Sequence, residues 1–178
     1  MHSLWLRVLL FAGVLLFSMS CTTLGYYSQS VSGQLGVMAR RKPVYELIND
    51  LGTNRQLKQR LVMVQSMRRF ASDTLVLPDN SSYTLYADIE RPYVVWNVFA
   101  APPFAMTTKT WCFPIVGCVA YRGYFAEEDA RRFGDSLEQE GYDVYIGGAV
   151  AYSTLGWFDD PILSTFISLS KPDTAALA

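Results

Sequence analysis

The amino-terminal segment decides which part of this chain has to fold. A single cation, Arg7, precedes an apolar run over residues 8–17, and small polar residues then lead to Cys21. This order is typical of a signal peptide, and the run is shorter than the ~20 residues that a permanent membrane-spanning helix needs. We therefore expect residues 1–20 to be removed on export, so that the remainder folds in an oxidising compartment.

Cys21 follows the small residue Ser20, as at a bacterial lipoprotein cleavage site whose cysteine becomes the acylated amino terminus. Ser18 stands where such sites usually carry an aliphatic residue, so ordinary secretion and a retained anchor helix are the alternatives. We expect lipid on Cys21, a stalk over residues 21–42, and a location on the bacterial cell envelope facing the periplasm. Each buried methylene of the lipid would contribute ~0.8 kcal/mol to membrane attachment.

With Cys21 assigned to lipid, Cys112 and Cys118 remain as an even pair. The Pro and Gly between them let the chain turn back, so we predict a disulfide. A loop this short removes little unfolded-state entropy, so the bridge would fix a local turn. The alternatives are a metal site, which needs further Cys or His ligands, and a catalytic thiol, which needs a basic partner.

The single histidine of the sequence limits the chemistry that the chain can perform. His2 lies in the expected export segment, so the mature chain would have neither a histidine general base nor a histidine metal ligand. Acidic residues adjoin at 127–129 and 159–160, but adjacent side chains diverge, and helix or turn capping explains both groups better. We assign no catalytic residue, no metal ligand and no cofactor to this chain.

Charge and composition narrow the class of partner. The formal net charge is -1 and the basic residues form no stripe, which argues against nucleic acid as a partner. The aromatic content of 14% suits a packed core, and it would also suit a groove for an apolar or peptide ligand. We expect a membrane partner through the lipid, together with a peptide substrate or an envelope protein.

The spacing of apolar residues predicts an α+β (mixed α/β) fold, with N-terminal helices followed by a small mixed sheet that has a helix inserted between its strands. We expect helices near residue 27, over 43–50, from a cap at Thr53 or Asn54 to residue 72, and over 126–140, and strands over 83–86, 93–100, 116–125 and 142–148. Gly141 would end the last helix.

Residues 147–161 combine glycines, hydroxyls and aromatics where a core strand would hold aliphatic residues. At a sheet edge, such a strand can bind an extended peptide by adding it as a further strand. Our candidate substrate-edge residues are Gly147, Gly148, Tyr152 and Ser153. An edge loop with its aromatics tucked inward explains the same residues without a ligand.

Four segments resemble known proteins: residues 93–102 (YVVWNVFAAP), 109–114 (KTWCFP), 117–125 (GCVAYRGYF) and 151–161 (AYSTLGWFDDP). They closely resemble the bacterial putative aminopeptidase family of zinc metallopeptidases, and the resemblance covers nearly the whole chain from Cys21 onward. In that family a segment like residues 163–166, followed by Pro-Asp-Thr, leads into a helix bearing HExxH. The resemblance implies that the two histidines of this motif hold zinc and that its glutamate polarises a water.

Pro-Asp-Thr is present at residues 172–174, but no HExxH follows it in this sequence. We therefore expect residues 43–178 to be the N-terminal part of a zinc-metallopeptidase-like domain, truncated before the motif and inactive alone, although zinc is expected for the full-length family. The resemblance also implies that a sheet edge over residues 147–153 pairs with the peptide. The alternative is a non-catalytic envelope lipoprotein that binds peptides or a protein partner.

Overall fold

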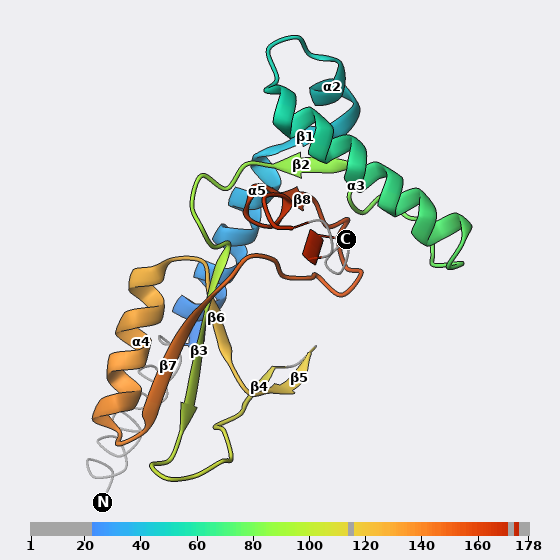
Figure 1. Cartoon of the computed structure of the whole chain (residues 1–178). Coiled ribbons are helices and arrows are strands. Elements are labelled where there is room, and N and C mark those ends of the chain that lie inside the picture. The colour runs from blue at the N-terminus through green and yellow to red at the C-terminus, as the bar shows by residue number, and fades with distance from the viewer. Residues whose placement is uncertain (1–22, 114–115, 171–172, 175–178) are drawn as a thin grey trace, which may run out of the picture.

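A computed structural model of the chain describes residues 23–113, 116–170 and 173–174, and it confirms the α+β fold class (Figure 1). The helices are one over residues 23–39, called the N-terminal helix below, α2 (Val44–Asn49), α3 (Arg55–Asp73), α4 (Glu127–Gln139) and α5 (Ser164–Ile167); the strands are β1 (Arg41–Pro43), β2 (Leu85–Ala87), β3 (Val95–Ala101), β4 (Trp111–Phe113), β5 (Gly117–Val119), β6 (Arg122–Tyr124), β7 (Asp143–Ala149) and β8 (Ile162–Leu163). The expected signal peptide and Cys21 lie outside the described residues.

The strands form three small sheets where the sequence predicted one. Their orders are β1-β2-β8, β6-β3-β7 and β4-β5. The strand expected over residues 116–125 is divided into β5 and β6, because β5 turns back on β4 as a hairpin while β6 pairs with β3. The sheet β6-β3-β7 is antiparallel throughout, and Asn97 in its central strand lies opposite Gly123 on one side and Gly147 on the other.

The long helices begin and end where the sequence predicted. The Asn54 side chain caps α3 by accepting hydrogen bonds from the backbone N–H groups of Gln56 and Leu57. At the end of α4, Gly141 adopts a φ of +88°, a conformation that suits glycine at a helix terminus. These signals are local, which is why the sequence alone could place them.

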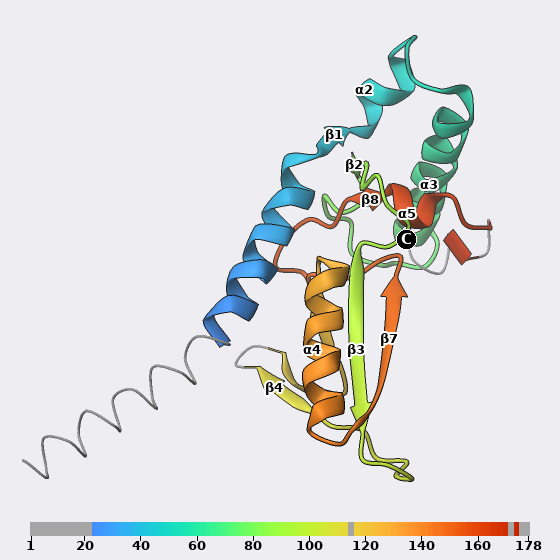
Figure 2. The same ribbon diagram turned by 90° about the vertical axis from the view of Figure 1, so that its left-hand side faces the viewer.

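The described residues form two apolar cores, and both include residues of β3. Trp96, Val98 and Ala100 occupy every second position of β3, so their side chains share one face and pack against α4. Figure 2 shows α4 lying along β3 and β7. The other core joins Leu61 of α3 and Phe166 of α5 with the small sheet β1-β2-β8. Because α4 covers only one face of the sheet β6-β3-β7, the opposite face is available for a site.

Within the segment expected to be a stalk, residues 23–39 form the N-terminal helix, which packs on the body of the protein (Figure 2). Gln29 in this helix donates from Nε2 to the Gly123 carbonyl at 3.4 Å and accepts from the Phe125 N–H at 3.1 Å. A further strand would use these same backbone groups, so Gln29 closes the β6 edge of the sheet. At the other edge, β7 has no strand neighbour beyond β3 within the part of the chain that the structure describes.

None of the helices in the described residues combines the length and the apolar character that a membrane crossing requires.

Candidate functional site

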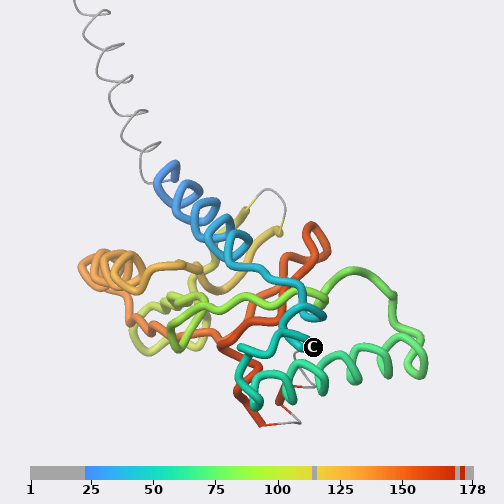
Figure 3. Tube along the Cα trace, turned by 90° about the horizontal axis from the view of Figure 1, so that it is seen from above, coloured from blue at the N-terminus to red at the C-terminus, as the bar shows by residue number. Residues whose placement is uncertain are grey.

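A groove of about 900 Å³ lies over the face of the sheet that α4 leaves uncovered. Its floor comes from Val95 and Asn97 of β3, Gly123 of β6 and Ala149 of β7. Its walls come from the N-terminal helix, the β4–β5 hairpin and residues 151–158, which lie around the same side of the sheet in Figure 3. Segments far apart in the sequence therefore build one site.

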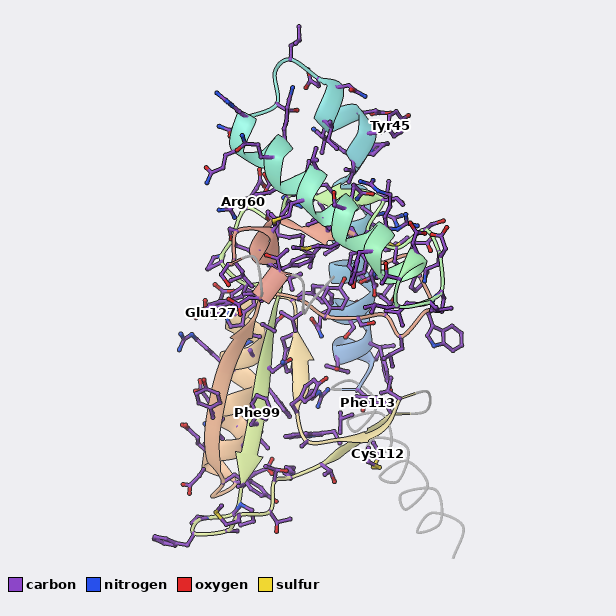
Figure 4. The ribbon with its side chains drawn as sticks, turned by 45° about the vertical axis from the view of Figure 1, so that its right-hand side comes forward. Tyr45, Arg60, Phe99, Cys112, Phe113 and Glu127 are labelled. Atoms are coloured by element: carbon purple, nitrogen blue, oxygen red, sulfur yellow. A yellow bond between two sulfur atoms is a disulfide. The ribbon has the colours of Figure 1, made fainter. Side chains whose placement is uncertain are left out.

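The walls of the groove are aromatic and uncharged. Eight aromatic residues line it: Tyr26, Tyr27, Phe113, Tyr121, Phe125, Tyr152, Trp157 and Phe158. Among the described residues, the lining contains no Asp, Glu, Lys or Arg side chain. Phe99, on the same face of β3, continues the aromatic surface through ring contacts with Tyr121 and Tyr145, and Figure 4 labels it on that strand. Such a surface suits an apolar ligand that carries a few polar groups.

The disulfide between Cys112 and Cys118 is present, as predicted. It joins directly opposite residues of β4 and β5. The neighbouring Phe113, labelled with Cys112 in Figure 4, stacks on Tyr26 of the N-terminal helix with 5.6 Å between ring centroids. The bridge therefore fixes the hairpin that forms one wall of the groove.

Tyr152 holds the chain after β7 against the N-terminal helix. Its hydroxyl donates a hydrogen bond to Gln34 Oε1, and its ring meets Phe125 edge-on with 5.6 Å between centroids. Burial raises the pKa of Tyr152, and the negative charge of Asp160 acts in the same direction. The hydroxyl therefore stays protonated at neutral pH and serves as a donor.

Asp160 organises the loop that carries Ser153. Its carboxylate accepts hydrogen bonds from the Thr154 backbone N–H at 3.2 Å, from Thr154 Oγ1 at 2.7 Å and from Ser153 Oγ at 3.1 Å. For Asp160, this is the turn-stabilising role that the sequence favoured. In the other acidic group, Glu127 and Asp129 pair with arginines one turn along α4.

The four candidate substrate-edge residues divide between two places. Tyr152 and Ser153 line the groove, whereas Gly147 and Gly148 lie within the edge strand β7. An added Cβ on Gly148 would come within 2.3 Å of the Tyr93 ring, so this glycine allows Tyr93 to pack against the sheet. Gly148 thus has a packing role, and the binding of substrate by all four residues stays a prediction.

The described residues contain no group of three or more His, Cys, Asp or Glu side chains that could hold a metal ion. A zinc site of the HExxH kind therefore has no ligand set among them, and no step through zinc is assigned to these residues.

The comparison with protein families decides the affiliation of the chain. A family model described as "putative aminopeptidase" matches residues 25–178, which is most of the sequence. The chain belongs to this family. Every residue that lines the groove lies within the part matched to the putative aminopeptidase family. Neither a curated protein nor a solved structure matches the chain.

Two residues on the floor of the groove, Asn97 and Gly123, were not predicted from the sequence. Asn97 is the only polar residue in β3, and asparagine is depleted in strands. A polar residue in the middle of an apolar strand is a signal that could have identified it. Gly123 gave no such signal, because its importance depends on its pairing opposite Asn97.

Proposed function

We propose that this chain acts in the removal of residues from the amino termini of peptides, as the name of its family describes, and that it holds the substrate peptide in the aromatic groove. The observation that carries the proposal is the groove of about 900 Å³ over the uncovered face of the sheet. Hydrolysis belongs to the zinc-bearing HExxH helix that the family resemblance implies. That motif is not part of this sequence, so the proposed role of these residues is to bind peptide without cutting it.

The lining of the groove matches the chemistry of an extended peptide. Its polar groups are uncharged: besides the tyrosine hydroxyls, they are supplied by Ser30, Gln34, Asn97, Ser153 and Thr154. The remaining surface is mainly aromatic or aliphatic. A peptide offers the same combination, with backbone N–H and C=O groups for the polar contacts and side chains for the apolar walls.

Strand addition along β7 is a second arrangement for the same peptide, and it is the one that the sequence predicts. The groove reaches β7 only at Ala149, so a peptide paired along the outer edge of this strand would depend little on the groove walls. Substitutions in the walls therefore distinguish the two arrangements.

We expect Phe158→Ala to weaken peptide binding about tenfold or more, because an aromatic anchor lost from a groove typically costs at least this much. Phe158 is 50% exposed and lines the groove. The probe is a hexapeptide of leucine, phenylalanine and alanine with a free amino terminus. Its binding is measured by isothermal titration calorimetry on the full chain in detergent.

Phe104→Ala is the matched control, since Phe104 is 107% exposed and does not line the groove. It should leave the affinity unchanged. An intact chain that binds no hexapeptide would refute the proposed function. Equal affinities of the wild type and Phe158→Ala for the hexapeptide would mean that the peptide binds outside the groove. Recovery of the hexapeptide uncut would support binding without cleavage, which is also how the alternative non-catalytic lipoprotein would behave.

We further propose that lipid on Cys21 tethers the chain to the bacterial envelope, facing the periplasm. Support comes from the order of the first 21 residues and from the exposed side chains of Leu24, Val31 and Leu35 on the N-terminal helix that follows. Cys21→Ser should move the chain from the membrane to the soluble fraction, and mass spectrometry should show the loss of the lipid. The double variant Cys112→Ser, Cys118→Ser should stay membrane-bound. Unmodified Cys21 in a membrane-bound wild-type chain would contradict the proposal.

A further inference from the structure

Asn97 lies on the groove floor. It is the only polar residue in β3, and both of its cross-strand neighbours, Gly123 and Gly147, lack side chains. An added Cβ on Gly123 would come within 3.3 Å of Asn97 Oδ1. Glycine at this position therefore keeps the space beside the carboxamide open.

The carboxamide of Asn97 has unused hydrogen-bonding capacity. Within the described residues, no protein group forms a hydrogen bond with it, although it can donate two and accept two. A ligand that displaced water from this floor without replacing its hydrogen bonds would leave a polar group unsatisfied, which is unfavourable. The occupant that fits must therefore bring a donor and an acceptor of its own.

Packing does not explain why residue 97 is asparagine. Its neighbours on the same face of β3 are Val95 and Phe99, and a branched apolar residue at position 97 would suit a strand better. An asparagine that the fold does not require, placed at the floor of a groove, points to a ligand.

We propose that the Asn97 carboxamide pairs with the backbone N–H and C=O of one residue in an extended peptide with uncharged side chains held in the groove. This inference rests on the proposed function. An extended peptide residue presents an N–H and a C=O, and a side-chain amide can donate to the C=O and accept from the N–H. Such a contact recognises the peptide backbone and does not depend on the side chain of the bound peptide residue.

The aromatic walls select the side chains of the same peptide. The described lining offers no charged group to a charged side chain, and burying a charge without a partner is costly. Peptides with leucine, phenylalanine or alanine over Asn97 are therefore preferred to peptides with lysine or glutamate there.

A lipid acyl chain is the competing occupant of an apolar groove of this size. An acyl chain has neither a donor nor an acceptor to offer Asn97, so the observations favour the peptide. Both occupants are distinguished in the experiment below.

The experiment measures hexapeptide binding to the full chain and to Asn97→Leu, which keeps a similar size and loses both hydrogen bonds. We expect affinity to fall about tenfold or more, while the melting temperature stays equal or rises because no internal hydrogen bond is lost. Asn49→Leu, at an exposed position on α2, is the control and should bind like the wild type. Replacing a central residue of the hexapeptide by lysine or glutamate should also weaken binding about tenfold.

A scan of hexapeptides methylated on one backbone nitrogen needs no protein substitution and covers the case in which Asn97→Leu fails to fold. One methylation should weaken binding to the wild type, and a folded Asn97→Leu variant should not discriminate against it, since the two changes remove the same contact. If the wild type binds no hexapeptide, the proposed function fails. If it binds and Asn97→Leu binds equally well, only the present inference fails. Preferential binding of a fluorescent fatty acid, unaffected by Asn97→Leu, would mean that the groove binds acyl chains, and it would overturn the present inference.

Discussion

Replacing Phe166 by alanine should lower the free energy of unfolding by about 3–5 kcal/mol, the cost typical of truncating a buried phenylalanine. Phe166 is 2% exposed and is among the largest fully buried side chains of the protein. It packs in the core that joins α3 to the sheet β1-β2-β8, together with Leu61, Val64 and Ile162. Because domains of this size are stabilised by only about 5–15 kcal/mol, this loss would be a large part of the total. Urea unfolding followed by circular dichroism measures it.

The effect should extend from the core to the groove. The hydroxyl of Thr165, next to Phe166, donates a hydrogen bond to the Val150 carbonyl, where the chain leaves β7 for the groove wall. From α3, Arg60 Nη1 donates to the Ile167 carbonyl at 2.7 Å. Through these two hydrogen bonds α5 connects α3 with the segment that carries Tyr152 and Ser153.

Phe70→Ala is the matched control for Phe166→Ala. Phe70 lies near the end of α3 and is 55% exposed, so its truncation should cost less than about 1 kcal/mol. Similar losses for the two variants would mean that Phe166 is not buried as described.

The elements that the sequence predicted are those whose signals are local. The Asn54 cap, the apolar spacing along α3 and α4, and Gly141 lie within the helices or next to them. The elements that it missed are short and depend on distant partners. β8 has two residues and pairs in parallel with β2, where Tyr86 lies opposite Ile162. No local pattern specifies such a strand, because its pairing is set by tertiary packing.

The candidate site shows the same division. Tyr152 and Ser153 could be selected because hydroxyls and aromatics replaced aliphatic residues in one continuous stretch, and the structure places both in the groove. The disulfide could be predicted because Cys112 and Cys118 remain as a pair once Cys21 is assigned to lipid, and the Pro and Gly between them allow a turn. The groove itself could not, since its floor combines residues from β3, β6 and β7 whose adjacency depends on register.

Gly33→Ala and Gly36→Ala, in the same helix, should change stability in opposite directions. A Cβ on Gly33 would come within 2.1 Å of Phe125 Cγ and 2.6 Å of Phe125 Cβ, close to the root of that side chain. Phe125 also meets Tyr152 edge-on and lines the groove, so it has little freedom to move away. We expect Gly33→Ala to cost about 1–3 kcal/mol, as overpacking typically does.

A Cβ on Gly36 meets nothing within 4 Å, so only the backbone preference remains there. Alanine within a helix is favoured over glycine by about 0.5–1 kcal/mol, and Gly36→Ala should therefore stabilise the protein by that amount. Because both variants gain the same helix preference, the difference between their free energies of unfolding isolates the contact of Gly33 with Phe125. Urea unfolding measures both values. A shared gain in stability would show that the N-terminal helix does not approach Phe125 this closely, and the groove would then lose the helix as one of its walls.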